Sequence, residues 1–222
     1  MATRPLPNRL VLIDGAAGKI ELAQSAPDSE SFLATAAIAV LAHPHPLFGG
    51  TMDNKVVTTL ARAFHDIGAV VYRFNFRGVG QSSGVHDEGR GETLDLLTVV
   101  QYARAQFGDD LPLWLGGFSF GGAVALKATE QIACEQMVLV APAFTRLASW
   151  ADGQPGSIAG GKPPQKTILI HGEIDETVPL ADSFAWARSH DVPVIVVPGA
   201  DHFFHKKLHI IRDLVMRLCR PL

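Results

Sequence analysis

The sequence predicts an α/β fold in which helices flank a doubly wound, mostly parallel sheet. Short apolar runs rich in β-branched residues alternate with longer segments of helical periodicity, and the runs end at Gly, Pro or Asp. Most runs are continuous rather than alternating, which is typical of parallel strands covered on both faces. This alternation of strand and helix favours one doubly wound sheet.

Two strand–helix pairs come after an antiparallel hairpin in the first half of the chain. Residues 9–13 and 19–23 flank the turn sequence Asp-Gly-Ala-Ala-Gly and predict that hairpin at the N-terminal edge of the sheet. Each of the two pairs is an apolar run and then a segment of helical spacing: 37–42 with 53–67, and 69–74 with 88–107.

The second half continues the same order. Its apolar runs predict strands at 113–117, 137–140, 167–170 and 194–197, and its helical patterns lie at 120–131, 180–189 and 204–218. The one long irregular stretch, 141–165, is rich in Gly and Pro and too short for a second domain. We therefore expect at most a flap there, and no cap domain.

Length and charge limit the class of protein. The chain has 222 residues, of which 47% are hydrophobic, and 19 Lys and Arg stand against 22 Asp and Glu. That length fits a single domain over residues 1–222 with a large core. Without a sustained basic run there is little for nucleic acid to bind, because phosphate neutralisation needs clustered cations. We expect a small-molecule substrate, and the sequence carries no signal for an oligomeric state.

Targeting signals are not evident. Two prolines lie within the first seven residues, and Asp14 and Lys19 interrupt the next stretch of the chain, so we expect no cleaved secretory peptide. The most apolar stretch, 32–42, is far shorter than the roughly 20 residues that span a bilayer. Only Cys134 and Cys219 are present, which is no disulfide framework. We expect a cytoplasmic protein that binds no membrane.

The pattern G-x-S-x-G occurs twice, at residues 80–84 and 117–121. A nucleophilic serine in this pattern needs a sharp strand-to-helix turn. Ser119 meets that need, because it comes after an apolar strand and precedes a helix start of small residues, where developing negative charge is favoured. Ser82 lies several residues beyond its strand and begins no helix, so we interpret it as part of a glycine-rich loop.

A serine nucleophile near pH 7 needs an imidazole base, and the base needs a carboxylate that holds its tautomer. Asp175 and His202 lie in the turns after the last two predicted strands, in the chain order serine, acid, histidine. Glu173 and Asp201 are the rival carboxylates, and His205 is the rival base. Position within the turns favours Asp175 and His202 as the catalytic pair for Ser119.

These motifs together resemble the α/β-hydrolase superfamily. More closely, the segments HPHPLFGGTMDNK at 43–55 and NFRGVGQS at 75–82 resemble a group of small bacterial hydrolases without a lid. The resemblance extends from about residue 37 to the end of the chain. It implies the minimal α/β-hydrolase fold without a cap domain, and it says nothing about the substrate.

An oxyanion hole would take one N–H from Phe120, the residue after the nucleophile. The second N–H should come from the loop after the strand at 37–42, where Pro44 and Pro46 have none to donate. That leaves His45 or Leu47. His45 is favoured, since related hydrolases place their donor at this distance from the strand end.

Five aromatic residues are candidates for lining an acyl pocket, with ordinary core packing as the alternative: Phe48, Phe118, Phe144, Trp150 and Phe203. A metal site is disfavoured, because the His202, His205 and His209 set lacks the glutamate of H-E-x-x-H. We therefore expect neither metal nor cofactor.

The prediction is a serine hydrolase, most specifically a carboxylesterase that acts on small acyl esters through an acyl-enzyme. A thioesterase or a peptidase of the same fold would use the same tetrahedral intermediate. A catalytically silent binding protein is the alternative from another class, because a fold alone does not establish an activity.

Overall fold

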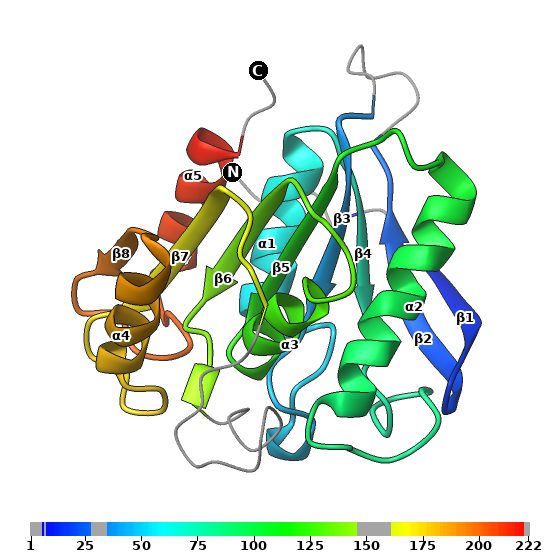
Figure 1. The fold of residues 1–222 in the computed structure, drawn as a ribbon, viewed down its shortest axis with the longest axis horizontal. Coiled ribbons are helices and arrows are strands. Elements are labelled where there is room, and N and C mark those ends of the chain that lie inside the picture. Colours follow the sequence, from blue (N-terminus) through cyan, green and yellow to red (C-terminus); the bar gives the residue numbers. More distant parts are fainter. Residues whose placement is uncertain (1–5, 7, 28–34, 146–160, 220–222) are drawn as a thin grey trace.

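The computed structural model describes residue 6 and residues 8–27, 35–145 and 161–219. Its centre is one eight-stranded sheet with the strand order β1-β2-β4-β3-β5-β6-β7-β8 (Figure 1). The strands are β1 Arg9–Gly15, β2 Gly18–Ser25, β3 Ala37–Ala42, β4 Ala69–Phe74, β5 Leu113–Phe118, β6 Gln136–Val140, β7 Lys166–Gly172 and β8 Val194–Val197.

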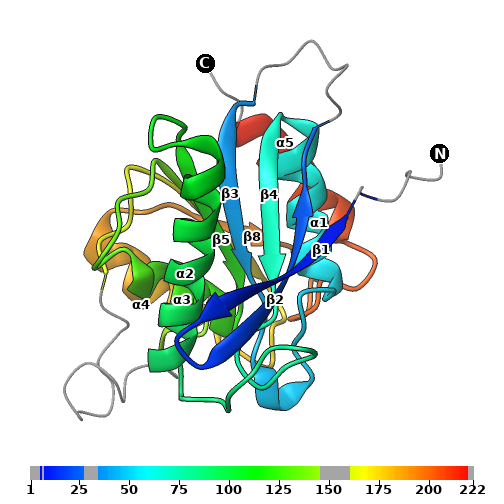
Figure 2. The same ribbon diagram turned by 90° about the vertical axis from the view of Figure 1, so that its right-hand side faces the viewer.

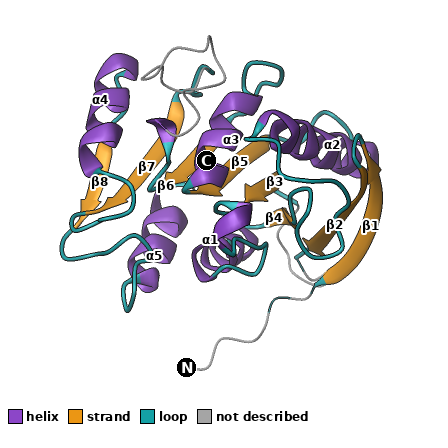
Figure 3. Cartoon of the chain, turned by 90° about the horizontal axis from the view of Figure 1, so that it is seen from below, coloured by secondary structure: helices purple, strands orange, loops and turns teal. Residues whose placement is uncertain are grey.

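Helices cover both faces of this sheet, with α1 and α5 on one side and α2, α3 and α4 on the other (Figure 3). The helices are α1 Lys55–Asp66, α2 Arg90–Phe107, α3 Phe120–Ala128, α4 Leu180–His190 and α5 Leu208–Leu218, with a short 3₁₀ helix, η1, at Pro46–Phe48. Among the described residues, no helix has the length and apolar character needed to cross a membrane.

The strand pairing confirms the predicted fold class. β4, β3, β5, β6, β7 and β8 are parallel to one another, whereas β1 pairs antiparallel with β2, and β2 antiparallel with β4. Figure 2 looks at this antiparallel edge, with α2 on one side of it and α1 on the other. Every residue of β3, β4, β5 and β6 is buried, as their continuous apolar runs predict.

Three predicted helix starts are wrong. The helix expected from residue 53 begins at Lys55, where the Asn54 side chain caps it by accepting from the Val56 N–H. For the other two helices, the backbone shows why. The last helix begins at Leu208 rather than at residue 204, because Phe204 and Lys206 have φ values of 52° and 61°. α2 begins at Arg90 rather than at residue 88, because Glu88 and Gly89 have φ values of 48° and 90°. A residue with positive φ cannot continue a right-handed helix, and side-chain periodicity alone does not reveal it.

The predicted flap at 141–165 falls mostly outside the described residues, because residues 146–160 are not described.

The parallel strands place the carboxyl ends of β5, β7 and β8 along one edge of the sheet. The loops after these three strands carry Ser119, Asp175 and His202. This edge is therefore where a site built from them has to form.

Candidate active site

Ser119 forms a sharp turn between β5 and α3. Its φ and ψ are 55° and −119°, a backbone conformation that non-glycine residues rarely adopt and that costs about 1–3 kcal/mol. The flanking glycines allow close approach of the backbone. A Cβ on Gly117 would lie 2.3 Å from the Gly121 carbonyl oxygen, and one on Gly121 would lie 2.4 Å from the carbonyl oxygen of Ala42. Only glycine fits at these two positions of the G-x-S-x-G pattern.

His202 connects Ser119 to Asp175. Its Nε2 lies 3.1 Å from Ser119 Oγ, and its Nδ1 lies 2.7 Å from Asp175 Oδ2. All three residues are largely buried. A carboxylate that accepts from Nδ1–H leaves Nε2 as the acceptor for the serine hydroxyl proton. The structure thus brings the three predicted residues together in the order that general-base activation requires.

Asp175 is held as a carboxylate by several donors. Its Oδ1 accepts hydrogen bonds from the N–H groups of Thr177 and Val178, at 2.9 and 2.8 Å. Burial by itself raises the pKa of Asp175, but hydrogen bonds from His171, His202 and Val178 N–H outweigh it and hold the pKa below its usual range. The group therefore stays charged opposite His202.

His171, at the end of β7, is a supporting residue that the sequence did not single out. Its Nε2 lies 3.3 Å from Asp175 Oδ2 and 3.0 Å from the carbonyl oxygen of Val178, so Nε2 faces two acceptors and carries the proton. Its Nδ1 then accepts from the Ser183 hydroxyl at 2.8 Å. His171 is completely buried, and its Nε2 contacts the same carboxylate oxygen, Oδ2, that faces His202, so it helps to fix the orientation of that carboxylate. A histidine at the end of an apolar strand was the only sequence signal.

The rival residues pair with other groups. Glu173 accepts from the N–H of Gly199 at 2.7 Å. Asp201 Oδ2 lies 2.6 Å from Nδ1 of His205, on the exposed side of the loop, and the hydrogen bond from the His205 side chain lowers the pKa of Asp201. The distances therefore favour Asp175 and His202 over both alternatives.

The loop after β3 approaches the start of α3. The ring centroids of His45 and Phe120 are 4.9 Å apart. The N–H of Leu47 donates to Nδ1 of His45 at 3.2 Å, and the N–H of Phe48 donates to the His45 carbonyl oxygen at 3.1 Å. The Leu47 N–H is therefore already engaged within its own loop.

His43 holds this loop in place. Its Nε2 accepts from the N–H of Phe76 at 3.0 Å, so its Nδ1 carries the proton and donates to the Pro44 carbonyl oxygen at 2.6 Å. Burial lowers the pKa of His43 to about 4, so the ring is neutral near pH 7. The residue therefore has a structural role, connecting the loop after β3 with the loop after β4.

Ser82 lies in the glycine-rich loop, as interpreted from the sequence. Its buried hydroxyl donates to the Asn75 carbonyl oxygen at 2.7 Å and accepts from the Glu21 N–H at 2.9 Å. The Asn75 side chain donates to Glu21 Oε2 at 2.8 Å and accepts from the Met52 N–H at 2.8 Å. The NFRGVGQS segment thus joins the N-terminal hairpin to the body of the sheet.

Two of the aromatic candidates are exposed, one beside His45 and the other beside His202. Phe48 is 77% exposed and its ring lies 4.7 Å from that of His45. Phe203 is 47% exposed and its ring lies 5.1 Å from that of His202. These two side chains are therefore placed where an apolar part of a ligand could contact them.

The other aromatic candidates lie differently. Phe118 is fully buried and packs against His202, with ring centroids 4.8 Å apart. Phe144 is fully buried and stacks on Trp186 at 4.5 Å. Trp150 lies outside the described residues. Phe118 and Phe144 thus contribute packing in this structure and offer no surface to a ligand.

His86 is a further histidine beside the loop after β3, and the sequence did not single it out. His86 has its ring 4.7 Å from that of His45 and 5.5 Å from that of Phe120. Its Nδ1 lies 2.8 Å from Oε1 of Glu92, which is completely buried at the start of α2. In the part of the chain that the structure describes, no three His, Cys, Asp or Glu side chains are grouped to hold a metal ion.

Comparison with known proteins gives a consistent family assignment. A family model described as serine aminopeptidase, S33, matches residues 45–162, which is more than half of the chain. An uncharacterized protein of Rickettsia prowazekii (strain Madrid E) is 28% identical over 207 residues, covering 89% of this chain and 82% of that protein.

Solved structures match over nearly the whole chain. XC6422 from Xanthomonas campestris, described as an α/β serine hydrolase without a lid, is 33% identical with a TM-score of 0.85, covering 98% of this chain and 95% of that one. An α-β serine hydrolase homologue from Coxiella burnetii is 36% identical with a TM-score of 0.81, covering 97% and 99%. The predicted resemblance to the α/β-hydrolase superfamily is thereby confirmed.

Proposed function

This chain is a serine hydrolase of the α/β-hydrolase superfamily and belongs to the family described as serine aminopeptidase, S33; from that premise we propose that it is a carboxylesterase acting on small acyl esters. The observation that carries the proposal is the hydrogen-bonded series from Ser119 through His202 to Asp175, with distances of 3.1 and 2.7 Å. Such a series is what activates a serine hydroxyl.

In the proposed reaction, His202 takes the Ser119 hydroxyl proton as the oxygen attacks the ester carbonyl. The protonated ring then gives that proton to the departing alkoxide, which leaves an acyl-enzyme and a free alcohol. Water, deprotonated by His202, attacks the acyl carbon, and the ring returns the proton to Ser119 as the carboxylic acid leaves. Asp175 remains a carboxylate throughout and stabilises the charged imidazole.

The N–H groups of Phe120 and His45 are the proposed oxyanion donors. The contact between the rings of these two residues supports this pairing, because it joins the loop after β3 to the first residue of α3. Each donor aimed at the developing oxyanion contributes about 2.7–4 kcal/mol to transition-state stabilisation. Leu47 is the weaker candidate, because its N–H already donates to the His45 ring.

The substrate class is inferred from the surface around the site. Phe48 and Phe203 are the proposed apolar contacts, and the rings of His45 and His86 add a more polar wall next to Phe120. The relative from Xanthomonas campestris is described as lacking a lid. An open site with small apolar contacts favours a short acyl chain over a long one, because little of a long chain would be removed from water.

The family description supplies a second candidate, an aminopeptidase. A carboxylate that recognises a peptide amine would have to lie near the nucleophile, and three acids among the described residues of the surrounding loops and of the start of α2 have other partners. Glu92 lies against His86, Asp201 against His205, and Glu173 accepts from the backbone of the next loop. These contacts favour the esterase, and a peptidase substrate in the same assays separates the two activities.

The test is labelling of the purified protein with a fluorophosphonate probe, together with hydrolysis assays. p-Nitrophenyl esters of increasing chain length and aminoacyl p-nitroanilides are given to the wild type and to Ser119→Ala. We expect labelling of the wild type only, and ester hydrolysis that is fastest for short acyl chains and lost in the variant. An unlabelled wild type, or activity that survives in Ser119→Ala, would contradict the mechanism. Preferential cleavage of the anilides would assign the aminopeptidase instead.

A further inference from the structure

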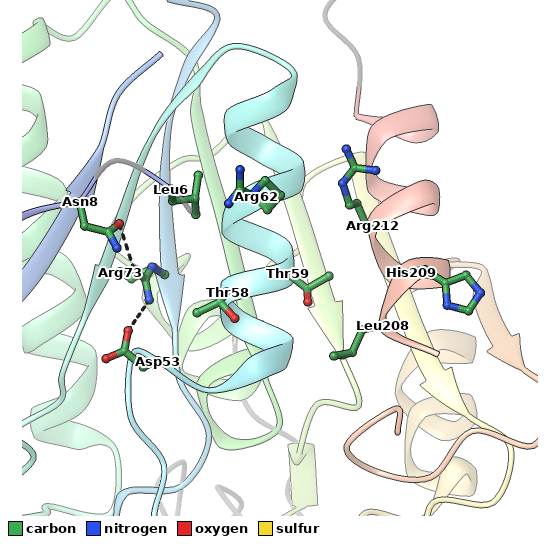
Figure 4. A pocket seen from close by; sticks show the side chains of 10 residues that line it. All are labelled: Leu6, Asn8, Asp53, Thr58, Thr59, Arg62, Arg73, Leu208, His209 and Arg212. Carbon is green, nitrogen blue, oxygen red and sulfur yellow. Dashed lines mark hydrogen bonds and ion pairs between the residues drawn. The ribbon is translucent and has the colours of Figure 1, made fainter. Parts of the chain in front are cut away.

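A pocket of about 370 Å³ lies on the outer side of α1, away from the candidate active site (Figure 4). Arg62 and Thr59 of α1 stand in its middle, Arg73 of β4 stands at one end, and His209 and Arg212 of α5 stand at the other. The described residues that line it include none of the three residues of the proposed triad. A volume of this size is in the range of small-molecule sites, roughly 300–1,000 Å³.

The charged side chains that line the pocket are mainly basic, whereas the chain as a whole has a small negative charge. Three arginines line the pocket, Arg62, Arg73 and Arg212, whereas Asp53 supplies the only carboxylate among the described residues of the lining. The whole chain has a formal net charge of −3. A concave surface with an excess of one charge attracts ligands of the opposite charge, and here the excess is positive even though Asp53 pairs with Arg73.

The guanidinium groups are only partly satisfied by the protein. Arg73 is 2% exposed and donates to the Met52 carbonyl oxygen, to Asp53 and to Asn8, at 2.7, 2.8 and 3.2 Å, yet its buried Nε has no partner among the described residues. Arg212 likewise donates to Asp66 at 2.7 Å through Nη2 and leaves a buried Nε without a described partner.

Arg62 is the least engaged of the three. Its side chain is partly buried and has no hydrogen bond or ion pair with any residue that the structure describes. It projects from the middle of α1, between the Arg73 end and the Arg212 end (Figure 4). A guanidinium that has no described partner is suited to bind an anion, because its planar fork matches carboxylate and phosphate oxygens.

We propose that this pocket binds a small organic polyanion whose carboxylate or phosphate groups are held by Arg62 and Arg212. Leu208 and the methyl group of Thr59 would contact the carbon skeleton of the ligand. The extended arrangement of the arginines across α1 favours a ligand with two or more anionic groups over a single inorganic ion. This binding function is independent of the proposed hydrolysis at Ser119.

The experiment measures the Tm of the full chain while an anion is added at constant pH and constant ionic strength. The probes are citrate, fructose 1,6-bisphosphate and inorganic phosphate, with sodium chloride as the reference. A ligand that binds only the folded state raises Tm, by about 5–10 °C at a hundredfold excess over Kd for a chain of this size. We expect a saturable rise with at least one of the two organic polyanions and a smaller one with inorganic phosphate.

Arg62→Gln is the test variant, and Arg188→Gln is its matched control on α4, an exposed arginine outside the pocket. Arg62→Gln should weaken polyanion binding about tenfold or more, and Arg188→Gln should leave it unchanged. Circular dichroism of both variants without ligand checks that they are folded, and Arg212→Gln serves if Arg62→Gln is not. The proposal is overturned if neither organic polyanion raises Tm above the chloride reference, or if the rise is equal in the wild type and in the pocket variant.

Discussion

The two G-x-S-x-G segments place the same side chain in opposite situations. Ser119 has a strained backbone, begins α3 and has its hydroxyl 3.1 Å from a histidine that is itself held by a carboxylate. Ser82 lies in a loop and uses its hydroxyl to connect the backbones of Asn75 and Glu21. A hydroxyl that both donates to and accepts from the backbone holds two segments together, whereas one that faces a neutral imidazole can lose its proton.

The surroundings of the two serines differ in the same way. Gly121 allows the start of α3 to touch the end of β3, next to the sharp turn at Ser119. In the other segment, a Cβ on Gly80 would meet the side chains of Glu21 and Asn75. Glycine is thus required in both segments, but only in the first does it flank the proposed nucleophile. Substitutions at the two serines and around them can test this division of roles.

The largest effect is expected from replacing the first serine. Ser119→Ala should lower kcat for a p-nitrophenyl ester by roughly 10⁴–10⁶-fold, because no nucleophile remains. Its Tm should stay close to that of the wild type, since alanine keeps the Cβ and no backbone hydrogen bond is lost. A large fall in Tm would instead indicate that Ser119 has a structural role like that of Ser82.

The second-largest effect is expected from replacing the carboxylate of Asp175. Asp175→Asn should lower kcat by about 10⁴-fold, because an amide in its place disturbs the tautomer of His202. The hydrogen bonds that lower the pKa of Asp175 also make its charged form a source of stability. This stability is present above the ordinary Asp pKa of about 3.9 and is lost as the pH falls through the lower pKa of the folded state.

Urea denaturation of the wild type and Asp175→Asn measures this stability between pH 7 and pH 3. The difference in the free energy of unfolding should be constant above about pH 5 and shrink below pH 4. Asp213→Asn, at an exposed position of α5, is the control, and its difference should stay small at every pH. A difference between the wild type and Asp175→Asn that does not change with pH would contradict the assigned pKa direction.

The oxyanion loop should give an intermediate effect. His45 has φ −52°, which suits proline, so His45→Pro removes the N–H with little change in the backbone. We expect kcat to fall about 10²–10³-fold relative to His45→Ala, which keeps the N–H and loses only the ring. Leu47→Pro should change kcat far less. The reverse ranking would assign the second donor to Leu47.

The smallest change in activity is expected at the second serine. Ser82→Ala should destabilise the fold by about 1–3 kcal/mol, because it leaves the buried Glu21 N–H and Asn75 carbonyl without this partner. Ester hydrolysis and fluorophosphonate labelling should persist at temperatures where the variant is folded. Chemical denaturation checks the stability, and loss of labelling in a folded variant would refute the structural role.

Local patterns predicted much of this molecule. Continuous apolar runs predicted the parallel strands, because a strand buried on both faces needs apolar residues on both. The small residues after Ser119 predicted the start of α3 correctly. The predicted starts of α2 and α5 were wrong, because Glu88, Phe204 and Lys206 have positive φ values that cannot be inferred from their side chains.

Side-chain partners were harder to predict. Asp175, Glu173 and Asp201 all lie in turns after strands, and only their orientation shows which one faces His202. The support from His171 and the contact between His86 and Glu92 depend on residues that approach through the packing of separate elements. The burial of Phe118 and Phe144 also results from that packing.

The sequence by itself determined the order of strands and helices along the chain, the sharp turn at Ser119 and the loops that carry Asp175 and His202. These are local properties, set by periodicity, turn chemistry and chain order. The tertiary structure decided which carboxylate and which histidine meet Ser119, how the Leu47 N–H is used, and that three arginines share one pocket. Those outcomes depend on the directions in which side chains from distant segments point, and packing alone sets these directions.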